Sequence, residues 1–260
     1  MEQRCGLPPP NTIVGVQIHP IRLPMLLDWI NIQARTHGRV SVMYANAHAI
    51  NLAQHNPFFR AALNTATVVF CDGQGLRIGA ALLGHPLPER FTPPDWIDQL
   101  VRRVAGPNQR VMLIGGLPGV AERAAARMQA WAPTTTFVYE HGYFTLGSAE
   151  ERLLLERIAL IRPQLLLIGM GMPRQELWLQ RHMHHLPVGV AMTVGALFDY
   201  LAGELPRAPR WVTDSGFEWA ARLVVEPQRL WRRYLLGNPY FFWLVLRQRL
   251  RERSTHRWKR

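Results

Sequence analysis

Uninterrupted apolar runs recur along the chain, and segments with helical spacing separate them. Residues 110–116 (RVMLIGG) and 164–171 (QLLLIGMG) are two such runs, which are typical of parallel strands covered on both faces. The segments between the runs carry apolar residues three and four positions apart, which predicts amphipathic helices. Strands and helices are therefore expected to alternate from about residue 11 to residue 203.

The pattern gives each expected element a place in the chain. Helices are expected at 22–36, 47–66, 93–106, 119–133, 148–163, 173–187 and from Gly195 onward. Strands are expected at 11–20, 38–47, 67–75, 110–116, 134–144, 164–171 and 188–195. This order predicts an α/β fold, a Rossmann-like α/β/α core with a parallel sheet, over residues 1–203.

The C-terminal part, residues 204–260, differs in composition from the core. It is rich in Arg, Trp and Phe, and Pro209, Pro227 and Pro239 are expected to break it into short helices. From Pro206 onward there are 13 basic and 4 acidic residues, whereas the first 205 residues hold 17 and 14. The net charge of +12 is therefore mainly a property of this appendage, which points to an anionic partner.

The aromatic stretch 240–246 (YFFWLVL) lies between arginines and is too short to span a bilayer. Binding to an anionic membrane surface is the first interpretation. A packed helix with a solvated basic face and a nucleic-acid site are the alternatives. No N-terminal stretch is apolar enough for a signal peptide, so we expect a cytosolic protein or one on the cytosolic side of a membrane.

Polar residues and glycines stand where the predicted strands end. Because ligands of open α/β sheets bind outside the carboxyl ends of the strands, these positions are expected to converge on one crevice. They are Asn46, Asp72-Gly73, Gly115-Gly116, Gly169–Glu176 and Gly195.

Two of these strand ends have alternative interpretations. Residues 169–176 (GMGMPRQE) lack the Gly-Lys-Ser/Thr of a P-loop and the third glycine of a dinucleotide fingerprint. They suit either a close backbone approach to a ligand or a tight turn with solvated Gln175 and Glu176. Asp72 is either a turn-former or a working acid–base group. The histidines show no metal-ligand spacing, and no Asp-x-Asp pair occurs.

Seven blocks of the sequence resemble the WecG/TagA/CpsF family of bacterial glycosyltransferases, in order and at plausible spacing, over roughly residues 38 to 240. The blocks are NAHAINLA, CDGQGLRIGAALLG, PERFTPPDWIDQL, LIGGLPGVAE, GMGMPRQELW, VGALFDYLAGELPRAPRW and GFEWAARLVVEPQRLWRRY. Rival classes are a nucleic-acid-binding protein that uses the basic tail and an NAD-dependent oxidoreductase, against which the incomplete glycine fingerprint argues.

The resemblance implies a hexosyltransferase with a GT-E-like fold, a Rossmann-like core plus a C-terminal helical appendage. The donor would be a UDP-sugar of the UDP-ManNAc, UDP-ManNAcA or UDP-glucose type, and the acceptor a polyprenyl-diphosphate-linked sugar in cell-surface or exopolysaccharide synthesis. The enzyme would be peripheral at the cytoplasmic face of the cell membrane, inverting and independent of metal. It would use no cofactor and bind no nucleic acid. The resemblance does not fix whether the enzyme forms a homo-oligomer.

The resemblance also assigns roles to residues. Asp72 matches the proposed catalytic base, and Tyr44 and Pro93 depart from the family pattern, where many members have Thr and Gly. The expected substrate-binding residues, with the strand-end glycines included, are Asn46, Arg90, Gly115, Gly116, Gly169, Gly171, Gln175, Glu176, Arg222, Arg229 and Arg232.

Overall fold

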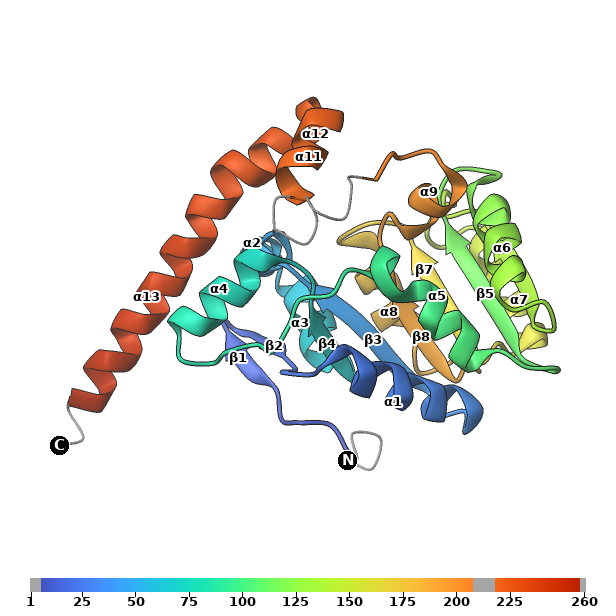
Figure 1. The fold of residues 1–260 in the computed structure, drawn as a ribbon, viewed down its shortest axis with the longest axis horizontal. Coiled ribbons are helices and arrows are strands. Elements are labelled where there is room, and N and C mark those ends of the chain that lie inside the picture. Colours follow the sequence, from blue (N-terminus) through green and yellow to red (C-terminus); the bar gives the residue numbers. More distant parts are fainter. Residues whose placement is uncertain (1–5, 208–217, 258–260) are drawn as a thin grey trace.

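The computed structural model describes residues 6–207 and 218–257, without the side chains of 218, 219, 221, 222, 229 and 255–257. Its centre is a six-stranded parallel sheet with the strand order β4-β3-β8-β7-β5-β6 (Figure 1). The strands are β3 (Val40–Ala45), β4 (Val68–Cys71), β5 (Arg110–Gly115), β6 (Thr136–Glu140), β7 (Leu165–Gly169) and β8 (Val190–Thr193). The predicted α/β class and Rossmann-like parallel sheet are confirmed.

Helices cover both faces of the sheet, because successive strand side chains point to opposite sides. In β3, Val42 and Tyr44 belong to one hydrophobic cluster, whereas Met43 and Ala45 belong to the other. The first face is covered by α1 (Leu23–Arg35), α5 (Pro93–Val104), α6 (Val120–Trp131) and α9 (Leu197–Ala202). The second is covered by α2 (Ala47–His55), α3 (Pro57–Thr65), α7 (Ala149–Ile161) and α8 (Arg174–His182).

Two of the predicted elements are divided in the structure. Residues 11–20 form not one strand but an antiparallel hairpin, β1 (Asn11–Ile13) and β2 (Val16–Ile18). The single helix expected at 47–66 is two helices, because Asn56 ends α2 and caps α3. Its side chain accepts a hydrogen bond from the Phe59 amide at 2.9 Å, and Pro57 begins α3.

Helix α4 (Gln74–Leu82) begins two residues after Asp72, with Gly73 as its N-cap, and was not expected as a separate helix. Its glycines lower helix propensity, but Gly79 has a packing reason. A Cβ at Gly79 would lie 2.5 Å from the ring of Phe241, so only glycine lets this ring approach the helix. Packing against the C-terminal part of the chain thus explains a glycine inside the helix.

The C-terminal part contains α11 (Glu218–Val225), α12 (Pro227–Trp231), a π-helix (Arg232–Leu236) and α13 (Gly237–Arg257). The expectation of only short helices is wrong for α13, which has 21 residues. Pro239 does not break it, because proline is tolerated in the first turn of a helix. No helix among the described residues is long and apolar enough to cross a membrane.

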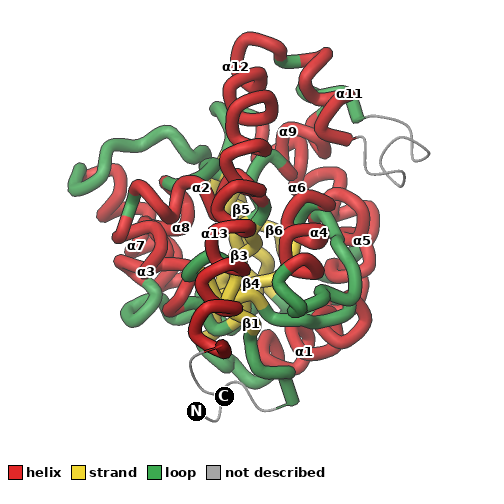
Figure 2. The backbone as a smooth tube through the Cα atoms, turned by 90° about the vertical axis from the view of Figure 1, so that its left-hand side faces the viewer, coloured by secondary structure: helices red, strands yellow, loops and turns green. Residues whose placement is uncertain are grey.

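Helix α13 runs along the flank of the core, where Figure 2 shows it crossing in front of β3 and β4. Phe241, Leu244 and Val245 are buried in the same cluster as α2 and α4. Near the middle of α13, the Gln248 side chain accepts a hydrogen bond from the Val14 amide at 2.7 Å. The division of the chain at residue 203 stays a prediction, although α13 itself is packed firmly on the core.

Candidate active site

The carboxyl ends of β3 and β4 bring Asn46 and Asp72 together. The Asn46 Nδ2 lies 3.4 Å from Asp72 Oδ2, and the Thr92 hydroxyl donates a hydrogen bond to Asp72 Oδ1 at 2.9 Å. The carboxylate is half-buried and held from two sides. Such a group keeps a fixed orientation, which suits a proton acceptor.

Local sequence explains how these side chains are held. Asn46 is the N-cap of α2, and its Oδ1 accepts a hydrogen bond from the Ala49 amide at 3.1 Å, which leaves its amide group for Asp72. Thr92 stands at the start of α5, and the neighbouring Phe91 amide bonds the Cys71 carbonyl at 3.2 Å. Pro93, the first residue of α5, therefore fixes the helix start next to Thr92.

The predicted glycines gather at the ends of β5 and β7. Gly115 and Gly169 are direct neighbours in the sheet, and a Cβ at Gly115 would lie 2.3 Å from the Gly169 carbonyl oxygen. Gly116 and Gly171 have φ angles of +67° and +77°, which favour glycine. Close backbone packing and positive φ angles thus explain why glycine occupies these positions; contact of these glycines with a nucleotide stays a prediction.

Gln175 and Glu176 are fully buried, at 0% exposure, rather than solvated on a turn. The Gln175 Oε1 accepts a hydrogen bond from the Gly195 amide at 3.1 Å, and its Nε2 donates to Glu176 Oε1 at 2.6 Å. Nε2 also lies 3.5 Å from the Tyr44 hydroxyl. These side chains form a buried polar layer that joins α8 to β3 and to the turn after β8.

Burial changes the acid–base state of this polar layer. Burial raises the pKa of Glu176 to about 7, and its Oε2 has no hydrogen-bond partner. Burial, followed by the charges of Glu176 and Asp72, raises the pKa of the Tyr44 hydroxyl well above its usual range. Tyr44 is therefore a neutral hydroxyl at physiological pH, next to the buried Gln175.

The predicted arginines lie in different surroundings. Arg90 is half-buried, and its charge acts on the pKa of the Cys71 thiol at the end of β4. Arg232 is exposed, with its guanidinium carbon 5.2 Å from the centre of the Trp231 ring. The side chains of Arg222 and Arg229 lie outside the described residues, so their roles stay predictions.

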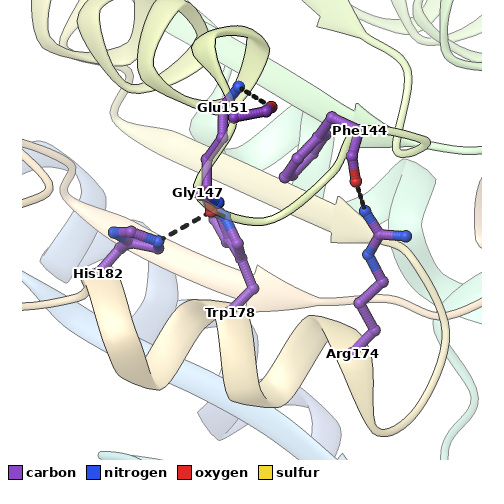
Figure 3. Close-up of polar contacts among 7 residues, drawn as sticks. Phe144, Gly147, Glu151, Arg174, Trp178 and His182 are labelled. Carbon is purple, nitrogen blue, oxygen red and sulfur yellow. Dashed lines mark hydrogen bonds and ion pairs between the residues drawn. The ribbon is translucent and has the colours of Figure 1, made fainter.

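The loop after β6 is fastened to α8 (Figure 3). The buried Glu151 carboxylate accepts hydrogen bonds from the Gly147 amide at 2.5 Å and from Trp178 Nε1 at 2.9 Å, and lies 3.1 Å from His182 Nε2. At the other end of the loop, Arg174 donates to the Phe144 carbonyl. The loop is thereby a fixed wall at the carboxyl edge of the sheet.

Two surface cavities of about 400 and 390 Å³ lie beyond this wall, along β6 and α7. Their charged side chains pair with one another, as His141 does with Glu150 at 3.2 Å and Arg157 with Glu140. Neither cavity is lined by a predicted site residue, so neither is assigned to the candidate site. Among the residues that the structure describes, no group of three His, Cys, Asp or Glu side chains is placed to hold a metal ion.

Sequence reasoning missed three residues near the candidate site. Thr92 lies in the sequence block PERFTPPDWIDQL, and its position before Pro-Pro-Asp could have marked a helix start beside Asp72. His48 and Arg233 could not be selected from the sequence, because their proximity depends on how α2 and the π-helix pack.

A parallel α/β/α sandwich with a held carboxylate and glycines at its strand ends defines a Rossmann-like protein with a candidate ligand site at those strand ends. A family model described as "Glycosyl transferase WecG/TagA/CpsF family" matches residues 11–255. The chain belongs to this family and is a glycosyltransferase, which confirms the resemblance.

Relatives in Staphylococcus aureus support this membership. Proteins from strains NCTC 8325 / PS 47 and MW2 are each 28% identical to the chain over 204 residues, which cover 78% of this chain and 78% of each relative. Both relatives are named N-acetylglucosaminyldiphosphoundecaprenol N-acetyl-beta-D-mannosaminyltransferase. The similarity therefore extends over most of the chain rather than one motif.

Proposed function

We propose that this glycosyltransferase moves a sugar from a UDP-sugar to a polyprenyl-diphosphate-linked sugar at the cytoplasmic face of a membrane. The observation that carries the proposal is the Asp72 carboxylate, held by Thr92 and Asn46 at the carboxyl edge of the sheet. The names of the Staphylococcus aureus relatives support a lipid-diphosphate acceptor. The donor is expected to be of the UDP-ManNAc, UDP-ManNAcA or UDP-glucose type.

In the proposed reaction, an acceptor hydroxyl attacks the anomeric carbon of the donor. Its oxygen forms the new glycosidic bond, Asp72 takes its proton, and the bond to the diphosphate breaks with its electron pair leaving on UDP. Attack from the face opposite the nucleotide inverts the anomeric centre. Arginine guanidiniums stabilise the developing diphosphate charge, because they match phosphate oxygens and stay protonated, and no metal ion is proposed.

A donor and acceptor screen tests this proposal. The full chain is incubated with each UDP-sugar and a synthetic polyprenyl-diphosphate-linked amino sugar, with and without a chelator. The mass of the lipid product is measured by mass spectrometry. We expect one UDP-sugar to add one sugar residue to the lipid, with UDP released in equal amount. An absence of product with every UDP-sugar, under conditions where the chain is folded, would contradict the proposal.

The exposed face of α13 supports the proposed membrane site. Trp243 and Leu246 are 52% and 54% exposed, and the Arg247 guanidinium carbon lies 5.4 Å from the centre of the Trp243 ring. Leu250 extends the same face one turn further. Apolar and basic groups that share one helix face suit the headgroup region of an anionic bilayer.

We expect a Trp243→Glu, Leu246→Glu double variant to bind phosphatidylglycerol vesicles at least about tenfold more weakly than the unmodified chain. Two apolar side chains no longer enter the bilayer and two negative charges are repelled, and about 1.4 kcal/mol already gives a factor of ten. Vesicle sedimentation measures the binding. Leu160→Glu is the matched control, because Leu160 is 84% exposed on α7, and equal binding by all three proteins would exclude the α13 face.

A further inference from the structure

The parallel sheet ends in β4 on one side and in β6 on the other, and the chain covers only the first of these edges with its own groups. At β4, the His19 amide donates to the Val69 carbonyl at 2.8 Å, and the Val69 amide donates to His19 Nδ1 at 3.1 Å. The Phe91 amide donates to the Cys71 carbonyl at 3.2 Å. These contacts occupy main-chain groups at the β4 edge and block the pairing of a further strand there.

At the other edge, β6 pairs only with β5 among the described residues. The Thr136 amide donates toward β5, to the Gln109 carbonyl at 2.9 Å. Alternate residues of a strand turn their main-chain groups to opposite sides, so the N–H and C=O groups of Phe137 and Tyr139 point away from β5. No described residue forms a hydrogen bond with these outward groups. The β6 edge is therefore open to another strand.

The surroundings of β6 leave room for such a strand. The surface cavity of about 390 Å³ is lined by all but the first residue of β6, by the start of α6 and by Arg157 of α7. Tyr139 is exposed, and so is Leu153, which lines the adjoining cavity of about 400 Å³. The strand sequence TFVYE is rich in residues that favour strands, and it lacks the lysine or proline that commonly protects a sheet edge.

The β6 strand is complementary to itself. In an antiparallel pair centred on Val138, Phe137 lies opposite Tyr139 of the partner subunit, and their outward N–H and C=O groups form a hydrogen-bonded pair. Phe137 and Tyr139 share one face of the strand, so each such pair also brings two aromatic rings together across the strands. Val138 meets Val138 of the partner subunit on the other face. This register satisfies every outward main-chain group of the two residues.

The charges near β6 also favour an antiparallel pair. Glu122 and Glu150 lie in the first turns of α6 and α7, which places acidic groups at the carboxyl end of β6. Arg110, the register partner of Thr136, and Arg162, which follows α7, lie at the amino end, where the Arg110 side chain donates to the Arg162 carbonyl at 3.4 Å. Antiparallel pairing brings the acidic end of one protomer to the basic end of the other, whereas parallel pairing would bring like charges together.

We propose that two copies of this chain associate through their β6 strands, which pair antiparallel about Val138 so that one sheet continues through both copies. Helix α13 packs at the opposite flank of the molecule, as Figure 1 shows with α13 at the left and α6 and α7 at the right. The exposed face of α13 therefore stays uncovered in this dimer. The association needs neither a substrate nor a lipid.

Tyr139→Pro and Tyr139→Thr are compared as a matched pair in the full chain. Both remove the ring and its hydrogen bond to Glu122, but only proline removes the outward N–H, and its ring stands in the way of a partner strand. The bonds of β6 to β5 do not use this N–H, so both variants should fold. Sedimentation velocity over a concentration series measures the dissociation constant of the dimer. We expect the unmodified chain to form dimers, and the dissociation constant of Tyr139→Pro to be at least about tenfold above that of Tyr139→Thr.

A cysteine cross-link tests the register. With Cys5 replaced by serine, Val138→Cys places two thiols opposite each other at a Cα separation of about 4.5 Å, within the range of a disulfide. Thr136→Cys is the control, because the two copies of residue 136 lie four positions apart in this register, about 13 Å. The remaining Cys71 is buried. We expect mild oxidation to link most of the Val138→Cys protein into covalent dimers and little of the Thr136→Cys protein.

Three results would each overturn the proposal. The first is an unmodified chain that sediments as a monomer at every concentration, which would leave the β6 edge to a different partner. The second is a dimer whose dissociation constant is the same in Tyr139→Pro and Tyr139→Thr. The third is equal cross-linking of the two cysteine variants, which would indicate random collision. If Tyr139→Pro fails to fold, the cross-link decides alone.

Discussion

Asp72→Asn is expected to lower the rate of sugar transfer by about 10²–10⁴-fold while the protein stays folded and binds UDP as before. Asparagine has nearly the same shape as aspartate, so it can still meet Thr92 and Asn46, but it cannot take a proton from the acceptor hydroxyl. Transfer is measured as lipid product per enzyme at saturating donor and acceptor. Circular dichroism and calorimetric UDP binding establish that only the chemical step has changed.

Asp28→Asn is the control for this experiment. It makes the same chemical change on an exposed residue of α1, where Asp28 pairs with Arg103 at 3.4 Å. We expect its turnover to equal that of the unmodified enzyme, because surface ion pairs contribute little. Full turnover by Asp72→Asn would remove this carboxylate from the role of base and would leave the proposed reaction without its proton acceptor.

Glu176→Gln is expected to change how stability depends on pH. Glu176 has a pKa of about 7 in the folded protein because of burial, against an ordinary value of 4.5 in the unfolded chain. Between these two values the folded state keeps a proton that the unfolded state has lost. The free energy of unfolding of the unmodified protein therefore declines as pH rises from 4.5 to 7, by on the order of 3 kcal/mol from this residue alone.

The glutamine variant is neutral at every pH and lacks this contribution. Relative to the unmodified protein, it should gain stability as pH rises from 5 to 8, by roughly 3 kcal/mol across the range. Urea unfolding at several pH values measures the difference. Glu156→Gln, an exposed change on α7, is expected to run parallel to the unmodified protein. If Glu176→Gln also runs parallel, Glu176 is ionised in the folded state.

The sequence predicts the sheet well, because buried parallel strands are apolar on both faces and β5, β7 and β8 read as continuous apolar runs. It predicts α4 and α13 poorly. Gly79 and Pro239 argue against helices when only local propensity is considered. Gly79 is nevertheless accommodated in α4 because the Phe241 ring packs against it, and Pro239 is tolerated in α13 because it lies in the first turn. Tertiary packing decides both cases.

The candidate site, too, could be predicted from the sequence only in part. Asn46 and Asp72 could be placed together from the sequence, because both follow strands of one parallel sheet. The burial of Gln175 and Glu176 could not, since a polar pair after a glycine turn is equally compatible with a solvated loop.

The hydrogen bond between Gln248 and Val14 joins residues separated by 234 positions. During synthesis the β1–β2 hairpin must therefore wait, without this partner, until residue 248 has left the ribosome. Because contacts between distant parts of a chain form late, α13 should dock onto a core that is already folded. The flank of the core that α13 covers would then stay open to solvent through most of the synthesis of residues 1–248.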